Sequence, residues 1–164
     1  MIQEYIFQHE KLNKFNSSSL NTIRIVTTRH NEDVHVLSAM LRIGVGGCVV
    51  DNLSSGGIGV GINSQTGKLK KYGCYYSKFN KKARLKHPVS KIKYEGYQLP
   101  CWQEVLKLVK DAHEIFYKLP TIGWDVAITR NGPIIIELNV EYSGVGLQAA
   151  DGGIKEKWYK LKEI

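Results

Sequence analysis

The sequence lacks any apolar run approaching the roughly 20 residues that cross a bilayer. Cysteine is scarce: Cys48, Cys74 and Cys101 are odd in number and widely spaced, so they form neither a zinc pattern nor a complete disulfide set. The first residues, 1–4, are not a basic segment followed by an apolar stretch, so no signal peptide is visible. Together these absences predict a cytoplasmic protein with reduced thiols.

Acidic residues are absent from residues 52–94, where basic residues accumulate. The stretch holds ten basic residues, and subtracting them from the net charge of +8 leaves −2 for the rest of the chain. Concentrated positive charge attracts polyanions such as nucleotide phosphates, nucleic acid or an acidic substrate. A solvated basic loop is the alternative for most of these side chains. The ten are Lys68, Lys70, Lys71, Lys78, Lys81, Lys82, Arg84, Lys86, Lys91 and Lys93.

Hydrophobic residues make up 43% of the 164 residues, enough for a single domain over residues 1–164 with its own core. Alternating and β-branched segments predict strands, and apolar residues at helical spacing predict one amphipathic helix at 100–119. The expected fold is therefore α+β, a mainly antiparallel sheet with one packed amphipathic helix. A Gly-containing loop is expected at 141–153, and 155–164 is either a terminal helix or frayed. The expected strands are 2–8, 20–28, 33–43, a hairpin within 61–73, and a second hairpin formed by 124–129 and 134–139.

The second hairpin carries most of the functional information. An Asn-Gly pair between its strands favours a tight turn. If the loop has three residues, 130–132, Asp125 lies directly across from Glu137, with Cβ atoms about 4.5–5.5 Å apart. Asn139 lies two residues beyond Glu137 and shares its face, whereas a two-residue loop would place Asp125 on the wrong face. The opposite face is expected to be core, formed by Trp124, Val126, Ile128, Ile134, Ile136 and Leu138.

Two opposed carboxylates repel each other, so a partner must offset that cost. Hard cations such as Mg²⁺ bind one or two carboxylates, add a neutral oxygen, and take their remaining ligands from phosphates and water. Asp125, Glu137 and Asn139 are therefore a candidate metal site. The alternative is that one carboxylate points to solvent or pairs with a lysine.

Four segments occur along the chain in an order typical of one enzyme family. They are Gln3 to His9, Ser18 to Ile25, Asp51-Asn52 with Gly56-Gly57, and the second hairpin. Together they resemble ATP-grasp enzymes, in particular the sugar-transfer-associated branch. The resemblance is to the ATP-grasp C-terminal subdomain. It implies that an N-terminal half completes the site, and we expect that half in the same protein, of which this sequence is a fragment, or in another chain.

The resemblance also implies roles for individual residues. A family member holds Mg²⁺, or Mn²⁺ in its place, against the ATP phosphates, which implies metal-binding roles for Asp125, Glu137 and Asn139. Arg24 is the implied catalytic residue: a charge inside an apolar strand needs an acidic partner or a phosphate, and the resemblance favours the phosphate. The implied nucleotide-contacting residues are Glu4, Tyr5 and Ile6, which border the adenine, with Asn21, Asp51 and Asn52.

The implied activity is ATP- and Mg²⁺-dependent ligation. A carboxylate is activated as an acyl phosphate and then attacked by an amine or a similar nucleophile, in sugar-transfer or polysaccharide pathways. The implied partners are ATP and a small carboxylate substrate, with no membrane. Two other classes stay open: a non-catalytic nucleotide-binding remnant, and a basic nucleic-acid-binding module centred on residues 68–93. Neither the carboxylate nor the nucleophile is identified by the sequence.

Overall fold

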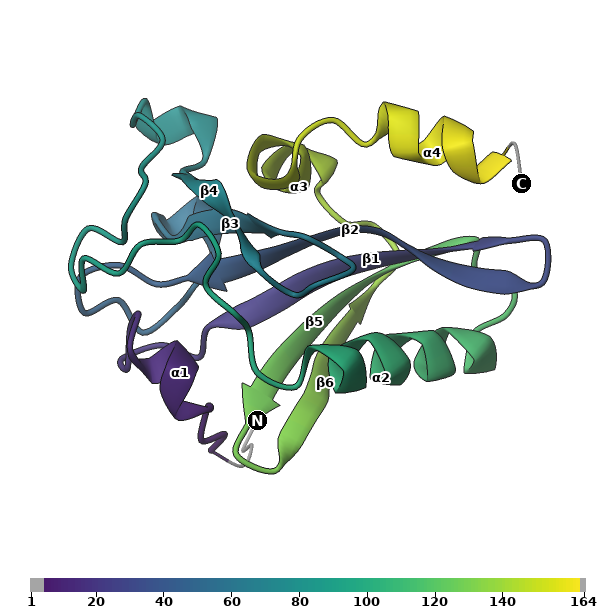
Figure 1. Ribbon diagram of the computed structural model, residues 1–164, viewed down its shortest axis with the longest axis horizontal. Helices are drawn as coiled ribbons and strands as arrows, with labels where there is room; N and C mark the ends of the chain where they lie inside the picture. The colour runs from purple at the N-terminus through teal and green to yellow at the C-terminus, as the bar shows by residue number, and fades with distance from the viewer. Residues whose placement is uncertain (1–4, 163–164) are drawn as a thin grey trace.

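The computed structural model describes residues 5–162 and contains a six-stranded sheet in the order β4-β3-β2-β1-β5-β6 (Figure 1). Neighbouring strands all pair antiparallel, which confirms the expected α+β fold. Of the segment 155–164, the described residues 155–162 form a helix, the first of the two alternatives. None of the helices in the described range is long and apolar enough to span a bilayer. The elements are α1 (Glu10–Asn13), β1 (Thr22–His30), β2 (Asp33–Ile43), η1 (Leu53–Ser55), β3 (Ile58–Ile62), β4 (Leu69–Cys74), η2 (Ser77–Phe79), α2 (Trp102–Ile115), β5 (Thr121–Thr129), β6 (Gly132–Asn139), α3 (Gly144–Asp151) and α4 (Lys155–Lys162).

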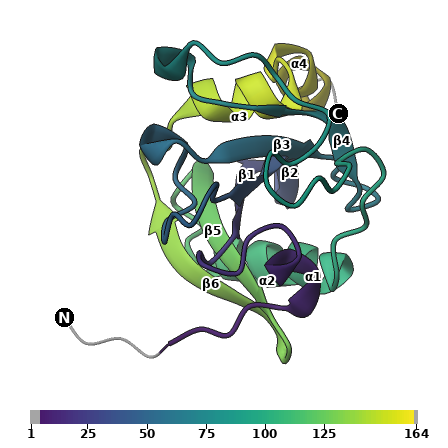
Figure 2. The same ribbon diagram turned by 90° about the vertical axis from the view of Figure 1, so that its left-hand side faces the viewer.

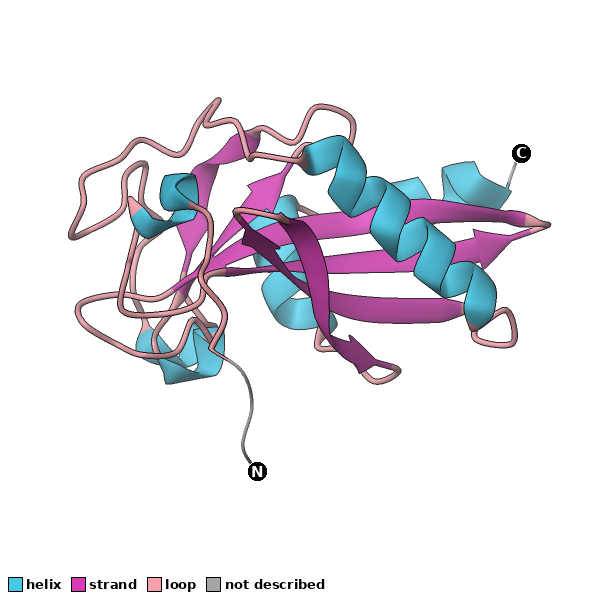
Figure 3. Ribbon diagram, turned by 90° about the horizontal axis from the view of Figure 1, so that it is seen from below, coloured by secondary structure: helices cyan, strands magenta, loops and turns pink. Residues whose placement is uncertain are grey.

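Helices cover both faces of the sheet. Figure 2 shows α3 and α4 above it and α2 below, and α2 crosses the strands obliquely in Figure 3. Alternation along β1 separates the two cores: Ile23 and Ile25 belong to the larger core under α2, and Val26 belongs to the smaller core under α3. Helix α2 is shorter than the expected range 100–119, and Phe116, which falls inside that range, lies beyond its end and is 44% exposed.

The strand expected over 2–8 is not found in its described part, where Gln8 alone forms an isolated bridge, to Thr129. The side chain of Gln8 bonds instead to the loop that follows α1. Its Oε1 accepts from the backbone of Asn21 at 3.0 Å, and its Nε2 donates to the carbonyl of Ser19 at 2.7 Å. Side-chain hydrogen bonds, rather than a strand ladder, therefore hold this segment.

The second hairpin has the expected carboxylate pair but not the expected loop. Thr129 pairs with Gly132, so the loop has two residues instead of three. Gly132 has a φ of +110°, a backbone conformation that favours glycine. A bulge at Ile136 then shifts the register by one residue, and Asp125 pairs with Glu137 after all.

The two-residue loop exchanges the faces of the isoleucines that lie between the turn and the bulge. Ile134 and Ile136, expected in the core, are 38% and 42% exposed. Ile135 packs against the larger core in their place, because it lies opposite the buried Val126. The expected face was wrong for these residues, since a two-residue loop reverses the side-chain alternation as far as the bulge.

The loop expected at 141–153 was wrong, because this segment contains α3. Its glycines suggested a loop, but they allow close packing. A Cβ on Gly146 would lie 3.2 Å from Leu53, and a Cβ on Gly61 of β3 would lie 2.4 Å from the carbonyl oxygen of Ala150. The helix therefore rests directly on the sheet, and these contacts outweigh the low helix propensity of glycine.

His87 gives the fold a pH-dependent stability. It is buried; its Nε2 donates to the carbonyl of Gly44 at 3.2 Å and its Nδ1 accepts from the backbone of Ser90 at 3.2 Å. Burial lowers the pKa of His87 below its ordinary value of 6.5, and Lys91 lowers it further. The unfolded chain therefore gains a proton that the folded chain resists, and stability is lost as the pH falls through 6.5 toward the folded pKa.

We expect the variant His87→Gln to lose less stability in acid than the parent does. The measurement is urea unfolding of both proteins between about pH 8 and about pH 5. The other histidines are common to both proteins, so the difference between the two curves isolates His87. Parallel curves across this range would contradict the assignment.

Candidate functional site

Four charged side chains meet on the α3 side of the sheet. Arg24 of β1 donates from Nε to Oδ1 of Asp125 and from Nη2 to Oδ2 of Asp125, the latter at 3.0 Å. Arg42 of β2 places Nη2 3.0 Å from Oδ2 of the same carboxylate. Asp125 is 4% exposed, so this is a buried carboxylate held by two arginines. The arginines offset much of the repulsion expected between Asp125 and Glu137.

Asp51 is the fourth member of this network. Its Oδ2 accepts from the backbone nitrogen of Thr22 at 2.9 Å and from the Thr22 hydroxyl at 2.5 Å, and lies 3.5 Å from Nε of Arg42. Burial raises the pKa of Asp51 above its ordinary value of 3.8, while Arg42 and the Thr22 hydrogen bonds act against that shift. With both carboxylates ionised, two positive and two negative charges cancel within the network.

Glu137 and Asn139 extend the site along β6. Glu137 is exposed and makes no ion pair within residues 5–162, although it lies directly across from Asp125. Asn139 has a buried Nδ2 for which the described residues supply no hydrogen-bond partner. An exposed carboxylate beside an unsatisfied amide fits a ligand that brings a cation and oxygen atoms.

The fit to a hard cation is partial. Both oxygens of Asp125 already accept hydrogen bonds from arginines. The side-chain oxygens of Glu137 and Asn139 are therefore more available as ligands for a cation. The described part of the chain holds no cluster of three or more His, Cys, Asp or Glu residues that would bind a metal unaided. Phosphate oxygens and water would have to complete the coordination, as they usually do for Mg²⁺.

A cavity of about 210 Å³ opens beside the network. It lies among η1, the start of α3 and the loop after β4, which Figure 2 shows gathered at one side of the molecule. Nη1 of Arg24 and Nη1 of Arg42 are not used in the network, and both residues line the cavity. The cavity is suited to an anionic oxygen. Its polar lining is Arg24, Arg42, Asn52, Ser54, Tyr76 and Ser143.

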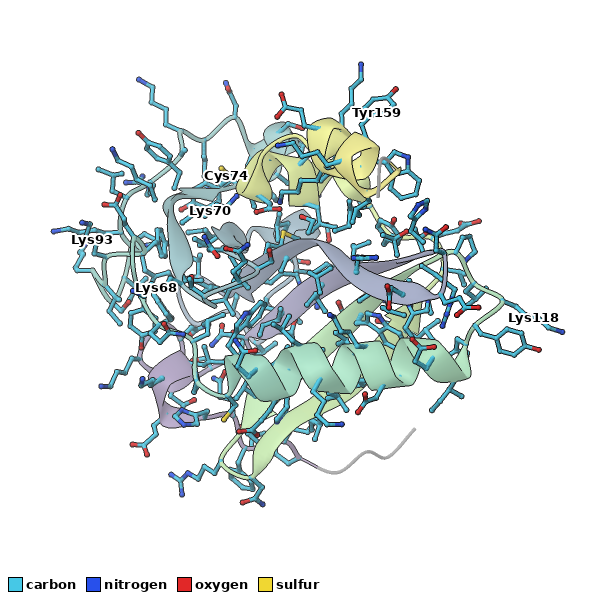
Figure 4. The ribbon with its side chains drawn as sticks, turned by 45° about the vertical axis from the view of Figure 1, so that its right-hand side comes forward. Lys68, Lys70, Cys74, Lys93, Lys118 and Tyr159 are labelled. Carbon is cyan, nitrogen blue, oxygen red and sulfur yellow. The ribbon has the colours of Figure 1, made fainter. Side chains whose placement is uncertain are left out.

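Helix α3 is anchored at its far end by Asp151, whose side chain is fully buried. Lys70 of β4 lies 2.6 Å from Oδ1, Lys157 of α4 lies 2.7 Å from Oδ2, and the Ser38 hydroxyl donates to Oδ2 at 2.7 Å. Figure 4 shows Lys70 beneath α3. These contacts join the C-terminal end of α3 to β4, α4 and β2.

The residues expected to border adenine lie at a different hollow. Tyr5 and Ile6 line an open hollow of about 780 Å³, and Glu4 lies outside the described residues. Ile136, the neighbour of Glu137, lines the same hollow. The hollow and the carboxylate pair are therefore adjacent along β6.

The other residues expected to contact the nucleotide lie at the cavity, in the charge network or in the interior. Asn52 lines the cavity, and Asp51 lies in the charge network. Asn21 is fully buried and lies in neither place. Its Nδ2 donates to Oε1 of Gln8 at 3.0 Å, and its Oδ1 accepts from the backbone of Gly44 at 3.2 Å. Asn21 thus joins the N-terminal segment to the end of β2, and its contact with a nucleotide stays a prediction.

Sequence reasoning missed Arg42 and Thr22. The available signal was the one used for Arg24, since Arg42 is also a charge inside an apolar strand. Ser143 and Tyr76 also went unrecognised, and no local pattern points to them. Only the packing of α3 and of the loop after β4 brings them to the cavity.

A family model described as sugar-transfer associated ATP-grasp matches residues 1–162. No curated protein matches the chain, and no solved structure does so. The match spans the strands, the charge network and the hairpin with its carboxylate pair.

Proposed function

Because the chain belongs to the sugar-transfer associated ATP-grasp family, whose domains bind ATP, we propose that it is part of an ATP-dependent ligase that activates a carboxylate. One observation supports this most: Asp125 and Glu137 oppose each other beside two arginines whose spare nitrogens can face the cavity. In this proposal the cavity takes the substrate carboxylate, and the hollow at Tyr5 and Ile6 takes the adenine.

The reaction begins when a carboxylate oxygen attacks the γ-phosphorus of ATP. The bond from that phosphorus to the β-γ bridging oxygen breaks, ADP leaves, and an acyl phosphate remains. The nitrogen of an amine then attacks the acyl carbon, loses a proton, and displaces inorganic phosphate. Phosphoryl transfer of this kind depends mainly on positioning and on charge stabilisation.

The chain's own residues supply both requirements in this proposal. Arg24 and Arg42 are held rigidly by Asp125 and Asp51, so Nη1 of each can orient the carboxylate and stabilise the transferring phosphoryl oxygens. Glu137 and Asn139 would hold Mg²⁺ or Mn²⁺, with Asp125 beside them. A bound divalent cation neutralises charge on the phosphates.

Further parts of the proposal rest on family membership alone. We infer that an N-terminal ATP-grasp half, in the same protein or in a separate chain, covers the nucleotide. We also place the reaction in sugar-transfer or polysaccharide pathways on that basis.

The variant Glu137→Gln is expected to weaken ATP binding in the presence of Mg²⁺ by at least about tenfold. The substitution removes a carboxylate charge and keeps the shape of an exposed side chain, so the fold is retained. The measurement is calorimetric titration of ATP with and without Mg²⁺. A matched control is Glu104→Gln, the same change at an exposed position on α2.

Two results would contradict this proposal. If Glu137→Gln and Glu104→Gln bind ATP alike, Glu137 is not a metal ligand. The second result has two parts: the parent chain binds ATP with Mg²⁺ and Glu137→Gln does not, yet the chain together with its N-terminal half turns over no carboxylate. The domain would then be a nucleotide-binding remnant.

A further inference from the structure

A short hairpin follows η2 and carries exposed positive charge. An isolated antiparallel bridge joins Lys86 to Lys93. The backbone nitrogen of His87 donates to the carbonyl of Ile92 at 2.9 Å, which closes a turn over residues 88–91. We call residues 84–94 the basic hairpin. The turn is its tip, and Arg84 lies at its base.

Buried contacts hold the basic hairpin against the rest of the domain. Two backbone hydrogen bonds of 2.7 and 2.9 Å join Arg84 to Gly73 of β4. Nε2 of His87 donates to the carbonyl of Gly44 at 3.2 Å, and Tyr94 is fully buried in the larger core. The outward-facing side chains of the hairpin are therefore presented on a firm base.

The hairpin has four exposed basic residues, Arg84, Lys86, Lys91 and Lys93. Lys86 and Lys93 lie directly opposite each other and share a face, and Arg84, two residues before Lys86, shares it too. Glu95, just beyond the hairpin, lies 2.9 Å from Lys93 and is the ion-pair partner that the described residues supply. Four cations less one carboxylate leave a surplus of three positive charges.

The opposed lysines need a source of negative charge. Like charges directly across a strand pair repel each other. Lys86 has no ion-pair partner within residues 5–162, and Lys93 has one exposed carboxylate beside it. Figure 4 shows Lys93 at the outer edge of the molecule, where an extended anionic surface can reach it. Such a surface would offset the repulsion and gain binding energy from the surplus charge.

Exposed aliphatic side chains accompany these charges. Val89, in the turn at the tip, is 59% exposed, and Leu85, between two basic residues, is 46% exposed. An aliphatic tip with cations behind it suits a bilayer that contains anionic lipid. The apolar group enters the headgroup region, while the cations stay with the charged headgroups.

The same features disfavour nucleic acid. Single strands bind through bases stacked on open aromatic faces. Tyr94 is the hairpin's one residue of the Phe, Trp and Tyr class, and it is fully buried. On the adjacent β4, the ammonium of Lys71 lies 5.5 Å from the centre of the Tyr72 ring and covers one of its faces. The exposed apolar groups of the hairpin are aliphatic, and they offer no stacking platform.

We propose that the basic hairpin attaches the protein to the surface of a membrane rich in anionic lipid. Val89 enters the headgroup region, and Arg84, Lys86 and Lys93 lie beside the headgroups. Attachment of this kind is peripheral and reversible. It departs from the sequence expectation of no membrane. It is also independent of the proposed function, because neither ATP nor the cavity takes part.

The test is co-sedimentation of the chain, without ATP, with vesicles of equal parts phosphatidylserine and phosphatidylcholine. The triple variant Arg84→Gln, Lys86→Gln, Lys93→Gln is expected to bind about a hundredfold more weakly at low salt, since each cation near an anionic surface contributes roughly fivefold. The three side chains are exposed, so the fold is retained. High salt should remove most of this difference.

A second variant tests the aliphatic contact. Val89→Ser is expected to weaken vesicle binding by about threefold, because part of the side chain no longer leaves water. This change removes no charge, so the ratio of the two affinities should not depend on salt.

The matched control for the charges is the triple variant Lys110→Gln, Lys118→Gln, Lys160→Gln. It removes the same charge from exposed positions elsewhere, and Figure 4 shows Lys118 at the opposite end of the molecule from Lys93. Equal loss in the two triple variants would overturn the inference, and so would equal binding to vesicles of phosphatidylcholine alone. Tighter binding, per negative charge, to an oligonucleotide or to polyglutamate than to the vesicles would overturn it as well.

Discussion

Asp125→Asn is expected to lower the free energy of unfolding by about 3–5 kcal/mol, the typical cost of breaking a buried ion pair by removing one partner. The carboxylate is buried and accepts from Arg24 and Arg42. Asparagine keeps the shape but offers a single oxygen and no charge. Arg24 would then lose its ion pair, and Arg42 would keep only the carboxylate of Asp51.

The measurement is urea unfolding at neutral pH, with Glu137→Gln as the control. Glu137 lies directly across the hairpin but is exposed and makes no ion pair with the described residues, so its change should alter stability by no more than about 0.5 kcal/mol. The pair of variants separates the two roles: Asp125 holds the network, and Glu137 faces the ligand. Equal destabilisation by both would show that the arginines do not depend on Asp125.

This network explains why the sequence predicted the carboxylate pair but not its main partner. The alternation of residues and the Asn-Gly turn placed Asp125 opposite Glu137, and that pairing is confirmed. The argument for it was wrong in detail, since two errors cancelled: the loop is one residue shorter, and the bulge at Ile136 restores the register. A bulge depends on contacts with neighbouring strands, which a single strand's pattern does not contain.

The partner of Arg24 shows a second limit of prediction from local sequence. Its position inside an apolar strand required an acid or a phosphate, and the structure supplies the acid, Asp125, from β5. Phosphate contact through the spare Nη1 stays a prediction. Local sequence cannot choose between the two, because β1 and β5 are about 100 residues apart in the chain and become neighbours only through the sheet.

The glycine-rich segments show where composition misleads. Glycines in 141–153 suggested a loop, whereas Gly146 lets α3 approach Leu53, and Gly61 of β3 lets the sheet approach the end of α3. The segment contributes Ser143 to the cavity wall, so missing the helix also meant missing one side of the site. By contrast, the apolar face of α2 was predictable, because burial on one face imposes a period that the sequence displays. The strand expected at 33–43 is found with the same bounds.

Trp124→Ala is expected to cost about 3–5 kcal/mol of unfolding free energy, as for other fully buried aromatic side chains. Trp124 is 1% exposed and faces the larger core, on the opposite side of β5 from Asp125. Its Nε1 donates to the hydroxyl of Thr27 at 2.7 Å. That hydroxyl lies 2.6 Å from Nδ1 of His113, and Nε2 of His113 lies 2.9 Å from the carbonyl oxygen of Leu119. The substitution therefore opens a cavity and removes the first donor of a buried chain of hydrogen bonds.

Urea unfolding of Trp124→Ala beside Trp124→Phe separates these contributions. Phenylalanine retains most of the buried ring and loses the hydrogen bond, so it should cost only about 1 kcal/mol beyond its smaller volume. If the alanine variant is as stable as the phenylalanine variant, packing of the ring is not the main contribution of Trp124 to the free energy of unfolding. The alanine variant should also weaken Mg²⁺-dependent ATP binding, because Trp124 positions the strand from which Asp125 reaches Arg24 and Arg42 on the other face.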